Sequence, residues 1–363
     1  MTMFKPFFTI TPEIMAYLMR LEALREEIKG LPITPFMLAS LRETARLESI
    51  HFSTQIEGNR LTQEEVIQVI KNGEYFPGRE RDQNELWDYL AGLDAVEKFV
   101  ASSAPLTEKF IQKLHGLVMA DGKTKVKPTP YRDGQNVIRD SSTNKIVYLP
   151  PESHDVPGLM KELVIWVNYS EKTNFPRPLI AAIAHYQFAT IHPYYDGNGR
   201  TARLLMTFIL RRGKYDLNGI YSHEECYAKN IPAYYQALDV GGHHNYYMGR
   251  ETADITGSIN YFCACLVESF EKVRPYAAIA AKQGDKDKSG ELRKLDPRQR
   301  KALVLFETTF IITSKEVEQL FKISARTARL LCQQWVEEGF LTLQNASKKA
   351  RSYELAPVFQ SLV

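Results

Sequence analysis

The sequence predicts a mainly α-helical fold: an all-α core that carries one β-hairpin, followed by a small helix-and-hairpin unit at the C-terminus. Three observations support this fold class. Apolar residues recur at helical spacing over most of the first 280 residues. Two short β-type runs lie within residues 136–149. A charged stretch, residues 281–297, has almost no apolar residues and is expected to be a linker to residues 298–363.

The bulk composition is that of an ordinary globular protein with two or three domains. The chain has 363 residues, of which 44% are hydrophobic and 25% are charged, so there is ample material for a core. The net charge is only +3. The chain as a whole is therefore no polyelectrolyte, and any contact with nucleic acid requires a local basic patch.

The cysteines favour neither a structural zinc site nor a disulfide framework. The four are Cys226, Cys263, Cys265 and Cys332, and no C-x-x-C pair occurs. The segment HEEC, residues 223–226, and the pair His243-His244 match no compact zinc spacing. Because the sequence has neither a leader pattern nor a run of 18 apolar residues, we expect a cytoplasmic protein without a membrane span.

Residues 1–104 are expected to form an N-terminal helical domain. A first helix ends at Gly30, which is a good terminator. A second begins at Pro35, which suits a first helical turn, and stops at Gly58. Two further amphipathic helices follow, and a capping box opens the first of them.

Residues 105–280 are expected to form the central core. A helix runs from Pro105 to about Met119, and the runs NVIRD and KIVYL then form a hairpin across SSTN. Further along, two almost wholly apolar helices, residues 178–191 and 201–213, are joined by the polar segment HPYYDGNGR. A polar loop thus lies between two core helices.

This polar loop has the composition of an anion site. Gly197 and Gly199 permit positive φ and a close backbone approach. Asn198 lies between them at the start of the second helix, where free N–H groups attract anions and form a nest for phosphate oxygens. Arg200 and Arg203 lie on one face of the first helical turn, and two guanidiniums suit a di- or triphosphate.

Two more side chains complete a site for transfer of a phosphate-containing group. Asp196 stands beside the nest, where a lone carboxylate naturally shares Mg²⁺ with phosphate oxygens. His192 is the expected general base, because it can take a proton from a hydroxyl that attacks phosphorus. The plain alternative is a structural histidine before proline and a common glycine turn. That alternative does not explain why all these residues occur together between two apolar helices.

The segment HPYYDGNGRTAR closely resembles the motif of the Fic family, His-Pro-Phe-x-[Asp/Glu]-Gly-Asn-Gly-Arg-x-x-Arg. Only Tyr194 departs from it, since it replaces the phenylalanine. The similarity extends from about Thr107 to Phe270 and implies an all-helical core with a β-hairpin flap. It also implies an enzyme that transfers AMP from ATP to a Ser, Thr or Tyr hydroxyl of a protein, with Mg²⁺ as cofactor.

The resemblance implies a role for each motif residue and adds others. The motif roles are His192 as the base, Asp196 as the Mg²⁺ ligand, Gly197, Asn198 and Gly199 as the anion hole, and Arg200 and Arg203 as the phosphate ligands. The hairpin from Asn136 to Leu149 would be the flap, along which a target protein adds a strand. Tyr234 and Tyr235 resemble a pair near the adenine, although aromatic pairs are usually core residues.

The segment STQIEGN resembles the inhibitory motif of the same family, [Ser/Thr]-x-x-x-Glu-[Gly/Asn]. Ser53 and Glu57 share one helix face, and Glu57 lies near a helix C-terminus, where a carboxylate is electrostatically disfavoured. A solvated glutamate is the plain alternative. The resemblance implies that Glu57 pairs with Arg203 and blocks the γ-phosphate, which describes the intramolecularly inhibited class with an N-terminal inhibitory helix.

Residues 298–363 look like a winged helix-turn-helix. Thr313 and Glu316 form a capping box, the second helix carries Arg326 and Arg329, and two short strands follow. The basic residues of the expected wing are Lys348, Lys349 and Arg351. Such a unit suits DNA, and the alternatives are packing against the core or contact in a homodimer.

Other functions stay open at the level of the sequence. A DNA-binding regulator could use the same core as a ligand sensor. An enzyme of this fold could also move UMP or a phosphate, or remove AMP. Self-modification is a further expectation for an enzyme that acts on protein hydroxyls. The sequence contains no Walker lysine pattern, which excludes a P-loop nucleotidase.

Overall fold

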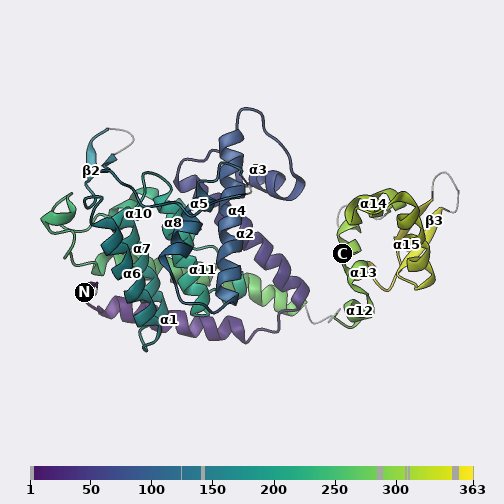
Figure 1. Ribbon diagram of the computed structural model, residues 1–363. Helices are drawn as coiled ribbons and strands as arrows, with labels where there is room; N and C mark the ends of the chain where they lie inside the picture. Colours follow the sequence, from purple (N-terminus) through teal and green to yellow (C-terminus); the bar gives the residue numbers. More distant parts are fainter. Residues whose placement is uncertain are drawn as a thin grey trace. The chain divides into compact units, whose positions relative to one another are not determined.

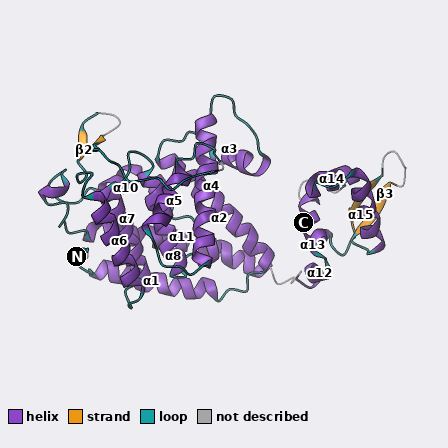
Figure 2. Ribbon diagram, in the orientation of Figure 1, coloured by secondary structure: helices purple, strands orange, loops and turns teal. Residues whose placement is uncertain are grey.

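The computed structural model divides the chain into two compact units (Figure 1). The first contains residues 1–31 and 36–279, and the second contains residues 32–35 and 280–363. The structure describes residues 4–123, 125–139, 144–283, 289–306, 309, 311–345 and 351–362. Helices predominate and the strands form short antiparallel pairs (Figure 2), so the predicted, mainly helical fold class is confirmed. Within these described ranges, no helix is both long and apolar enough to cross a bilayer.

The N-terminal helices begin and end where local chemistry requires. They are α1 (Pro12–Lys29), α2 (Pro35–Ile56), α3 (Gln63–Ile67) with a π-helical turn at Gln68–Asn72, and α4 (Glu80–Ala101). The Thr11 side chain accepts the Ile14 amide at the start of α1, and the capping box of Thr62 and Glu65 opens α3. After α2, Gly58 has a φ of +93°, which glycine adopts without strain.

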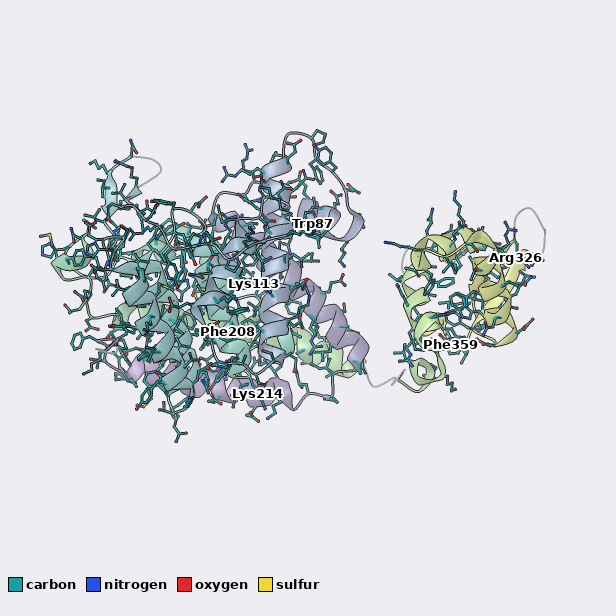
Figure 3. All side chains as sticks on the ribbon, in the orientation of Figure 1. Trp87, Lys113, Phe208, Lys214, Arg326 and Phe359 are labelled. Carbon is teal, nitrogen blue, oxygen red and sulfur yellow. A yellow bond between two sulfur atoms is a disulfide. The ribbon has the colours of Figure 1, made fainter. Side chains whose placement is uncertain are left out.

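The core of the first unit is built around α7 (Arg177–Ile191) and α8 (Asn198–Arg212). α5 (Glu108–Val118) packs on α8 together with α4, and α6 (Val156–Glu171) packs on α7. α7 is buried along almost its whole length, in agreement with its apolar sequence. Phe208, labelled in Figure 3, is one of the fully buried side chains of this interior. Close packing on several sides fixes the loop between α7 and α8 in place.

The predicted β-hairpin is present and short. β1 (Ile138–Arg139) pairs with β2 (Ile146–Tyr148) in antiparallel orientation, with Ile138 opposite Tyr148. Most of the predicted SSTN turn lies outside the described residues. The Tyr148 side chain is buried, whereas Ile146 and Val147 are exposed. The hairpin therefore has one anchored side chain at its base and an apolar surface open to solvent.

A disulfide bond joins two helices that follow the central pair. Cys226 lies on α9 (Glu224–Lys229), Cys265 lies on α11 (Thr256–Gln283), and α10 (Ile231–Leu238) lies between them in the chain. The sequence analysis considered a disulfide framework unlikely and did not predict this single bond. The fold brings their Cα atoms to 5.6 Å although the two cysteines are 39 positions apart in the sequence. No local sequence pattern therefore predicts the bond.

The second unit contains a helix, a turn, a second helix and a two-stranded sheet, in the predicted order. Its elements are α12 (Ser289–Lys294), α13 (Pro297–Ala302), α14 (Ser314–Phe321), α15 (Ala325–Glu337), β3 (Leu341–Asn345) and β4 (Ser352–Leu355). β3 and β4 are antiparallel, and Ile312 bridges Tyr353. Trp335 and Phe359 belong to one shared core, and Phe359 is labelled in Figure 3. The predicted wing residues Lys348 and Lys349 lie outside the described residues.

The described residues of the segment expected to be a linker, 281–283 and 289–297, are largely helical. α11 continues to Gln283, α12 lies within the segment, and Leu295 is buried in the core of the second unit. Asp296 then caps α13 by accepting the backbone amides of Arg298 and Gln299. The sequence does not predict this helical structure, because the segment is mostly charged and only a few apolar side chains pack against the core of the second unit.

Candidate active site

The loop between α7 and α8 is fixed at both ends by its backbone conformation. His192 ends α7 in the left-handed region with a φ of 51°, and Gly197 caps α8 with a φ of 73°. The Asn198 side chain accepts the Tyr194 amide at 3.0 Å and donates to the Tyr194 carbonyl at 2.9 Å. Thr201 Oγ1 donates to the Gly197 carbonyl at 2.8 Å. The motif therefore forms a rigid turn that leads into the N-terminus of α8.

The His192 ring is arranged to accept a proton. Its Nδ1 lies 3.4 Å from the Ala189 carbonyl oxygen. Because a carbonyl can only accept, this contact places the ring proton on Nδ1 and leaves the Nε2 lone pair free. Burial lowers the pKa of His192 to about 4, so the ring is neutral at pH 7. A neutral imidazole with a free nitrogen is competent as a general base.

Arg132 holds the backbone around His192, and sequence reasoning missed it. Its buried guanidinium donates from Nε to the His192 carbonyl at 3.0 Å and from Nη1 to the Gly134 carbonyl at 2.9 Å, and its Nη2 donates to the Pro151 carbonyl. Its own amide donates to the Pro193 carbonyl at 2.9 Å. One side chain thus ties the motif loop to the segments before and after the hairpin.

Side chains in and just before the hairpin also bond to the motif loop and to the end of α7. Asn136 Nδ2 donates to the Tyr194 carbonyl at 3.1 Å, and the Tyr148 hydroxyl donates to the Thr190 carbonyl at 2.8 Å. The Tyr195 hydroxyl donates to Asp133 at 2.8 Å. The base of the hairpin therefore sits beside His192 at a defined position.

Gly197 and Gly199 lie where any side chain would meet a neighbour. A Cβ at Gly197 would lie 2.7 Å from Met119 Sδ. A Cβ at Gly199 would overlap the carboxylate of Glu57 and lie 3.1 Å from Arg203 Nη1. A helix N-terminus attracts negative charge, and here the Glu57 carboxylate of the same chain lies directly over that position.

Arg203 is fully buried and pairs with Glu57. Its Nη2 donates to Glu57 Oε1 and to the Ser53 carbonyl, and its Nε donates to Ser53 Oγ, all at 2.8 Å. Burial opposes the charge, but Glu57 and Tyr234 outweigh burial and raise the pKa of Arg203 above its usual value. The Nη1 atom is buried, has no hydrogen-bond partner among the described residues, and lies 3.1 Å from the position that a Cβ would take at Gly199.

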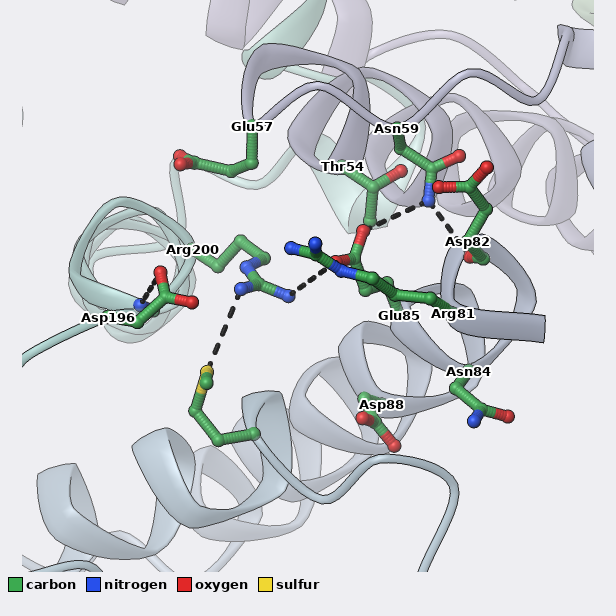
Figure 4. A network of polar contacts seen from close by, with 12 residues as sticks. Thr54, Glu57, Asn59, Arg81, Asp82, Asn84, Glu85, Asp88, Asp196 and Arg200 are labelled. Carbon is green, nitrogen blue, oxygen red and sulfur yellow. Dashed lines mark hydrogen bonds and ion pairs between the residues drawn. The ribbon is translucent and has the colours of Figure 1, made fainter. Parts of the chain in front are cut away.

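Arg200 has looser partners (Figure 4). Its Nη1 lies 3.9 Å from Glu85 Oε1, and its Nη2 donates to Met119 Sδ at 3.7 Å. Asn59 Nδ2 donates to the other Glu85 oxygen at 3.1 Å. The Arg200 Nε is buried and has no hydrogen-bond partner in the part of the chain that the structure describes. Phosphate oxygens would satisfy these N–H groups better than the present neighbours do. The sequence analysis missed Glu85, because it lies on α4 and belongs to no recognisable motif.

Asp196 fits a magnesium ion shared with phosphates better than a closed metal site. It is exposed, and its Oδ1 accepts the Gly197 amide at 2.6 Å. No group of three or more His, Cys, Asp or Glu among the described residues is arranged to hold a metal. Magnesium typically takes one or two carboxylates together with substrate phosphates and water, and a single exposed carboxylate beside an anion nest suits that mode.

His115 supports the loop from α5 and was also missed. Its ring stacks on Tyr194 with the centroids 3.5 Å apart, and its Nε2 donates to the Asp196 carbonyl at 2.8 Å. Burial lowers the pKa of His115 to about 4, so it stays neutral at pH 7. The stacked ring explains why an aromatic residue is needed at position 194. Nothing in the local sequence of α5 distinguishes His115 from a core histidine.

The two tyrosines assigned to the adenine occupy different environments. Tyr234 is buried, stacks on Tyr227 and shares a hydrogen bond of 3.2 Å with His185. The Tyr235 side chain is 49% exposed. Tyr235 is thus available to a ligand, whereas Tyr234 is held as part of the core.

Comparison with known proteins finds similarity to Fic proteins. Residues 105–210 match the model of the Fic/DOC family. The chain is 28% identical over 201 residues to the protein adenylyltransferase Fic of Aedes aegypti. That match covers 54% of this chain and 38% of the relative. The chain spans about two fifths of the length of the curated relatives it matches.

Two solved structures resemble the fold. A Fic family protein from Desulfovibrio desulfuricans has a TM-score of 0.61 and 24% identity, with 97% of this chain and 98% of that chain covered. A Fic-domain signalling protein from Bacteroides thetaiotaomicron has a TM-score of 0.60 and 26% identity, with 74% and 97% covered. The helical architecture is therefore that of Fic proteins.

Proposed function

We propose, from the match of residues 105–210 to the Fic/DOC family model, that the protein is a protein adenylyltransferase, which moves AMP from ATP to a Ser, Thr or Tyr hydroxyl. The observation that carries the proposal is the neutral His192 ring beside a glycine turn and two arginines. A base, an anion seat and two cations in one loop are the groups that transfer of a phosphate-containing group requires.

The chemistry follows from the position of each group. His192 Nε2 takes the proton of the attacking hydroxyl, the hydroxyl oxygen bonds to the α-phosphorus, and pyrophosphate leaves. The amides at the start of α8, together with Arg200 and Arg203, stabilise the negative charge of the phosphates. Asp196 would hold Mg²⁺, which neutralises phosphate charge when it is bound.

The hairpin β1–β2 is the proposed docking edge for the protein target. A two-stranded sheet leaves an edge unpaired, and the exposed Ile146 and Val147 offer apolar contacts to an added strand. Because the chain's own hydroxyls are also acceptors of this kind, self-modification is part of the proposal. A cytoplasmic location and a homodimer belong to it as further predictions.

Autoinhibition by Glu57 is the regulatory part of the proposal. It is supported by the carboxylate over Gly199 and by the ion pair with Arg203. At about 4 Å and an effective dielectric near 20, one charge contact is worth roughly 4 kcal/mol before desolvation. Suppressing nucleotide binding about 100-fold needs only about 2.7 kcal/mol. The contact is therefore strong enough to act as a switch.

The test uses ATP labelled at either phosphate. Incubation of the Glu57→Gly variant with Mg²⁺ and α-labelled ATP should label protein, whereas γ-labelled ATP should not. Transfer of the γ label would instead indicate phosphorylation. His192→Ala should abolish transfer, and His243→Ala is the matched control because His243 is exposed. Absence of any label from the Glu57→Gly variant would overturn the proposed activity.

DNA binding by the second unit is a second candidate function, which one observation favours. Arg326 and Arg329 on α15 are exposed, and neither has an acidic partner within ion-pair distance in the part of the chain that the structure describes. Free arginines on the second helix of a winged helix-turn-helix suit DNA phosphates. Binding to a labelled duplex at about 50 and 200 mM salt should weaken with salt and with Arg326→Ala. DNA binding that depends neither on salt concentration nor on Arg326 would contradict this candidate function and would favour contact with another protein as the role of the second unit.

A further inference from the structure

Arg132 is a buried cation whose three side-chain nitrogens each donate to a backbone carbonyl. The residue is only 4% exposed. Nε donates to the His192 carbonyl at 3.0 Å, Nη1 to the Gly134 carbonyl at 2.9 Å, and Nη2 to the Pro151 carbonyl. Burial of a charge is costly, and a neutral side chain would avoid that cost. What a guanidinium adds is a planar fork of donors, which reaches several acceptors at once.

The three carbonyls belong to three different segments of the chain. Gly134 precedes β1, Pro151 follows β2, and His192 ends α7. Gln135 Nε2 donates to the Pro150 carbonyl at 2.9 Å, which joins the two ends of the hairpin directly. Arg132 adds His192 to this junction. The base of the hairpin and the backbone of the expected general base therefore share one guanidinium.

The backbone of His192 is in a conformation that its surroundings must maintain. Its φ of 51° lies in the left-handed region, which residues other than glycine adopt uncommonly. Arg132 holds both peptide units there, because Nε binds the His192 carbonyl and the Arg132 amide donates to the Pro193 carbonyl at 2.9 Å. Removal of the Arg132 side chain thus takes one support from His192 and one from each end of the hairpin.

We infer that Arg132 is a positioning residue that couples acceptor docking to the general base: it fixes the hairpin relative to His192, so that a hydroxyl presented along the hairpin edge meets Nε2. This inference rests on the proposed function and deepens its acceptor side. The partners of Arg132 are carbonyls outside the turn that receives the phosphates. Its loss therefore slows the transfer step and leaves nucleotide binding unchanged.

The experiment measures self-labelling by α-labelled ATP and Mg²⁺ in the Glu57→Gly background. Arg132→Ala should lower the maximal labelling rate about 100-fold, which a misplacement of the reacting groups by about 1 Å can cause, and should change the KM for MgATP less than about twofold. Arg132→Lys should also label slowly at an unchanged KM, because one ammonium cannot replace a planar fork that reaches three carbonyls. This second variant decides the question if Arg132→Ala does not fold.

Arg212→Ala is the matched control for the loss of an arginine from this unit. Arg212 is partly buried at the opposite end of α8, where it donates to the Ala104 carbonyl at 2.6 Å and pairs with Glu171 at 3.2 Å. The variant should keep both the maximal rate and the KM of the Glu57→Gly protein.

Free guanidinium distinguishes positioning from a general loss of structure. Guanidinium chloride at millimolar concentrations, well below those that unfold proteins, should restore much of the rate of Arg132→Ala, because the three carbonyls remain as its acceptors. Methylammonium chloride at the same concentration should restore little. An unchanged maximal rate in Arg132→Ala, a parallel rise of the KM, or equal effects of the two cations would overturn the inference.

Hydrogen exchange keeps the two proposals separable. If the Glu57→Gly variant takes up no label at all, the proposed enzymatic function fails. The coupling of the hairpin to His192 is then decided by the backbone amides of residues 133–139 and 192–197. Faster exchange of both segments in Arg132→Ala, slowed again by guanidinium, supports the coupling. Faster exchange of only one segment, or of neither, refutes it.

Discussion

Arg203 and Arg200 differ in how tightly the chain holds them. Arg203 makes three hydrogen bonds of 2.8 Å to Ser53 and Glu57, whereas the nearest carboxylate oxygen to Arg200 lies 3.9 Å away. A ligand that binds both arginines must displace existing partners mainly at Arg203. In the proposed mechanism, control of the site is therefore concentrated at the Arg203 guanidinium.

Replacement of Glu57 should release that control. We expect Glu57→Gly to increase affinity for MgATP and nucleotidyl transfer by about 100-fold, because the competing charge contact, roughly 4 kcal/mol before desolvation, exceeds the roughly 2.7 kcal/mol that such a change requires. Calorimetry with MgATP and α-label incorporation measure the two effects. Glu57→Gln keeps the shape without the charge and should fall between the wild type and Glu57→Gly. Equal affinity for MgATP in all three proteins would contradict autoinhibition by Glu57.

The pKa of His192 sets the pH dependence of the proposed reaction. Burial lowers this pKa to about 4, and only the neutral ring accepts a proton. Transfer by the Glu57→Gly variant should therefore stay level from about pH 8 to pH 6 and fall as the pH drops toward 4. Circular dichroism at each pH separates this loss from unfolding. A midpoint near the ordinary histidine value of about 6.5 would show that the ring is not desolvated.

The motif residues could be predicted from the sequence because their chemistry is local. Gly197, Asp196 and the two arginines lie in one short segment, where spacing alone places them together. Arg132, His115 and Glu85 could not be found in this way, since their partners lie far away in the chain. The Glu57–Arg203 pair spans 146 positions, and only a family resemblance suggested it.

At the scale of elements, α2 leads directly to Glu57 and is joined to the core helices by polar contacts. Ser49 and Ser53 lie one helical turn apart on α2, and both end on polar groups of the core helices. Lys272 on α11 adds ion pairs to Glu48 of α2 and to Glu225 of α9. α2 is therefore held on α9 and α11 along the same side that presents Glu57 to α8.

The disulfide between α9 and α11 should contribute measurably to stability. A cross-link that closes a loop of this length stabilises by roughly 2–4 kcal/mol through the unfolded chain. Cys226→Ser should lower the thermal midpoint, and dithiothreitol should lower that of the wild type by a similar amount without affecting the variant. Titration of the unfolded, unreduced protein should find two thiols, those of Cys263 and Cys332. Four thiols would show that the bond does not form.

Individual helices could be predicted from the sequence, because the spacing of apolar residues and the capping residues are local features, as for α1 and α14. The ordered part of the expected linker was not predictable, because α12 and Leu295 gain their order from packing in the second unit. Local sequence patterns indicate the helix or strand propensity of a segment. The burial of one or two side chains against a core that is distant in the sequence produces no periodic pattern.

At the scale of the whole molecule, buried histidines make stability depend on pH. Burial lowers the pKa of His185 and His223 to about 3, and that of His115 and His192 to about 4. In the unfolded chain these rings take up protons below about pH 6.5. The unfolded state therefore binds more protons than the folded state as the pH falls from about 6.5 to 3, and the free energy of unfolding should decrease over that range.

Thermal unfolding checks this dependence. The midpoint should be lower at pH 5 than at pH 7 at constant ionic strength, and it should fall further toward pH 4. A midpoint that does not change between pH 7 and pH 5 would mean that these rings are already protonated or solvated in the folded protein.

The overlap between the Glu57 carboxylate and the space above Gly199 has a consequence for how such a protein would respond in a cell. If the Glu57 carboxylate and the nucleotide phosphates exclude each other from this space, they compete for it according to mass action. A rise in nucleotide concentration would then displace the carboxylate gradually. The response would be graded, with a set point fixed by the strength of a single ion pair. Sequence changes around that pair would tune the threshold without altering the catalytic groups.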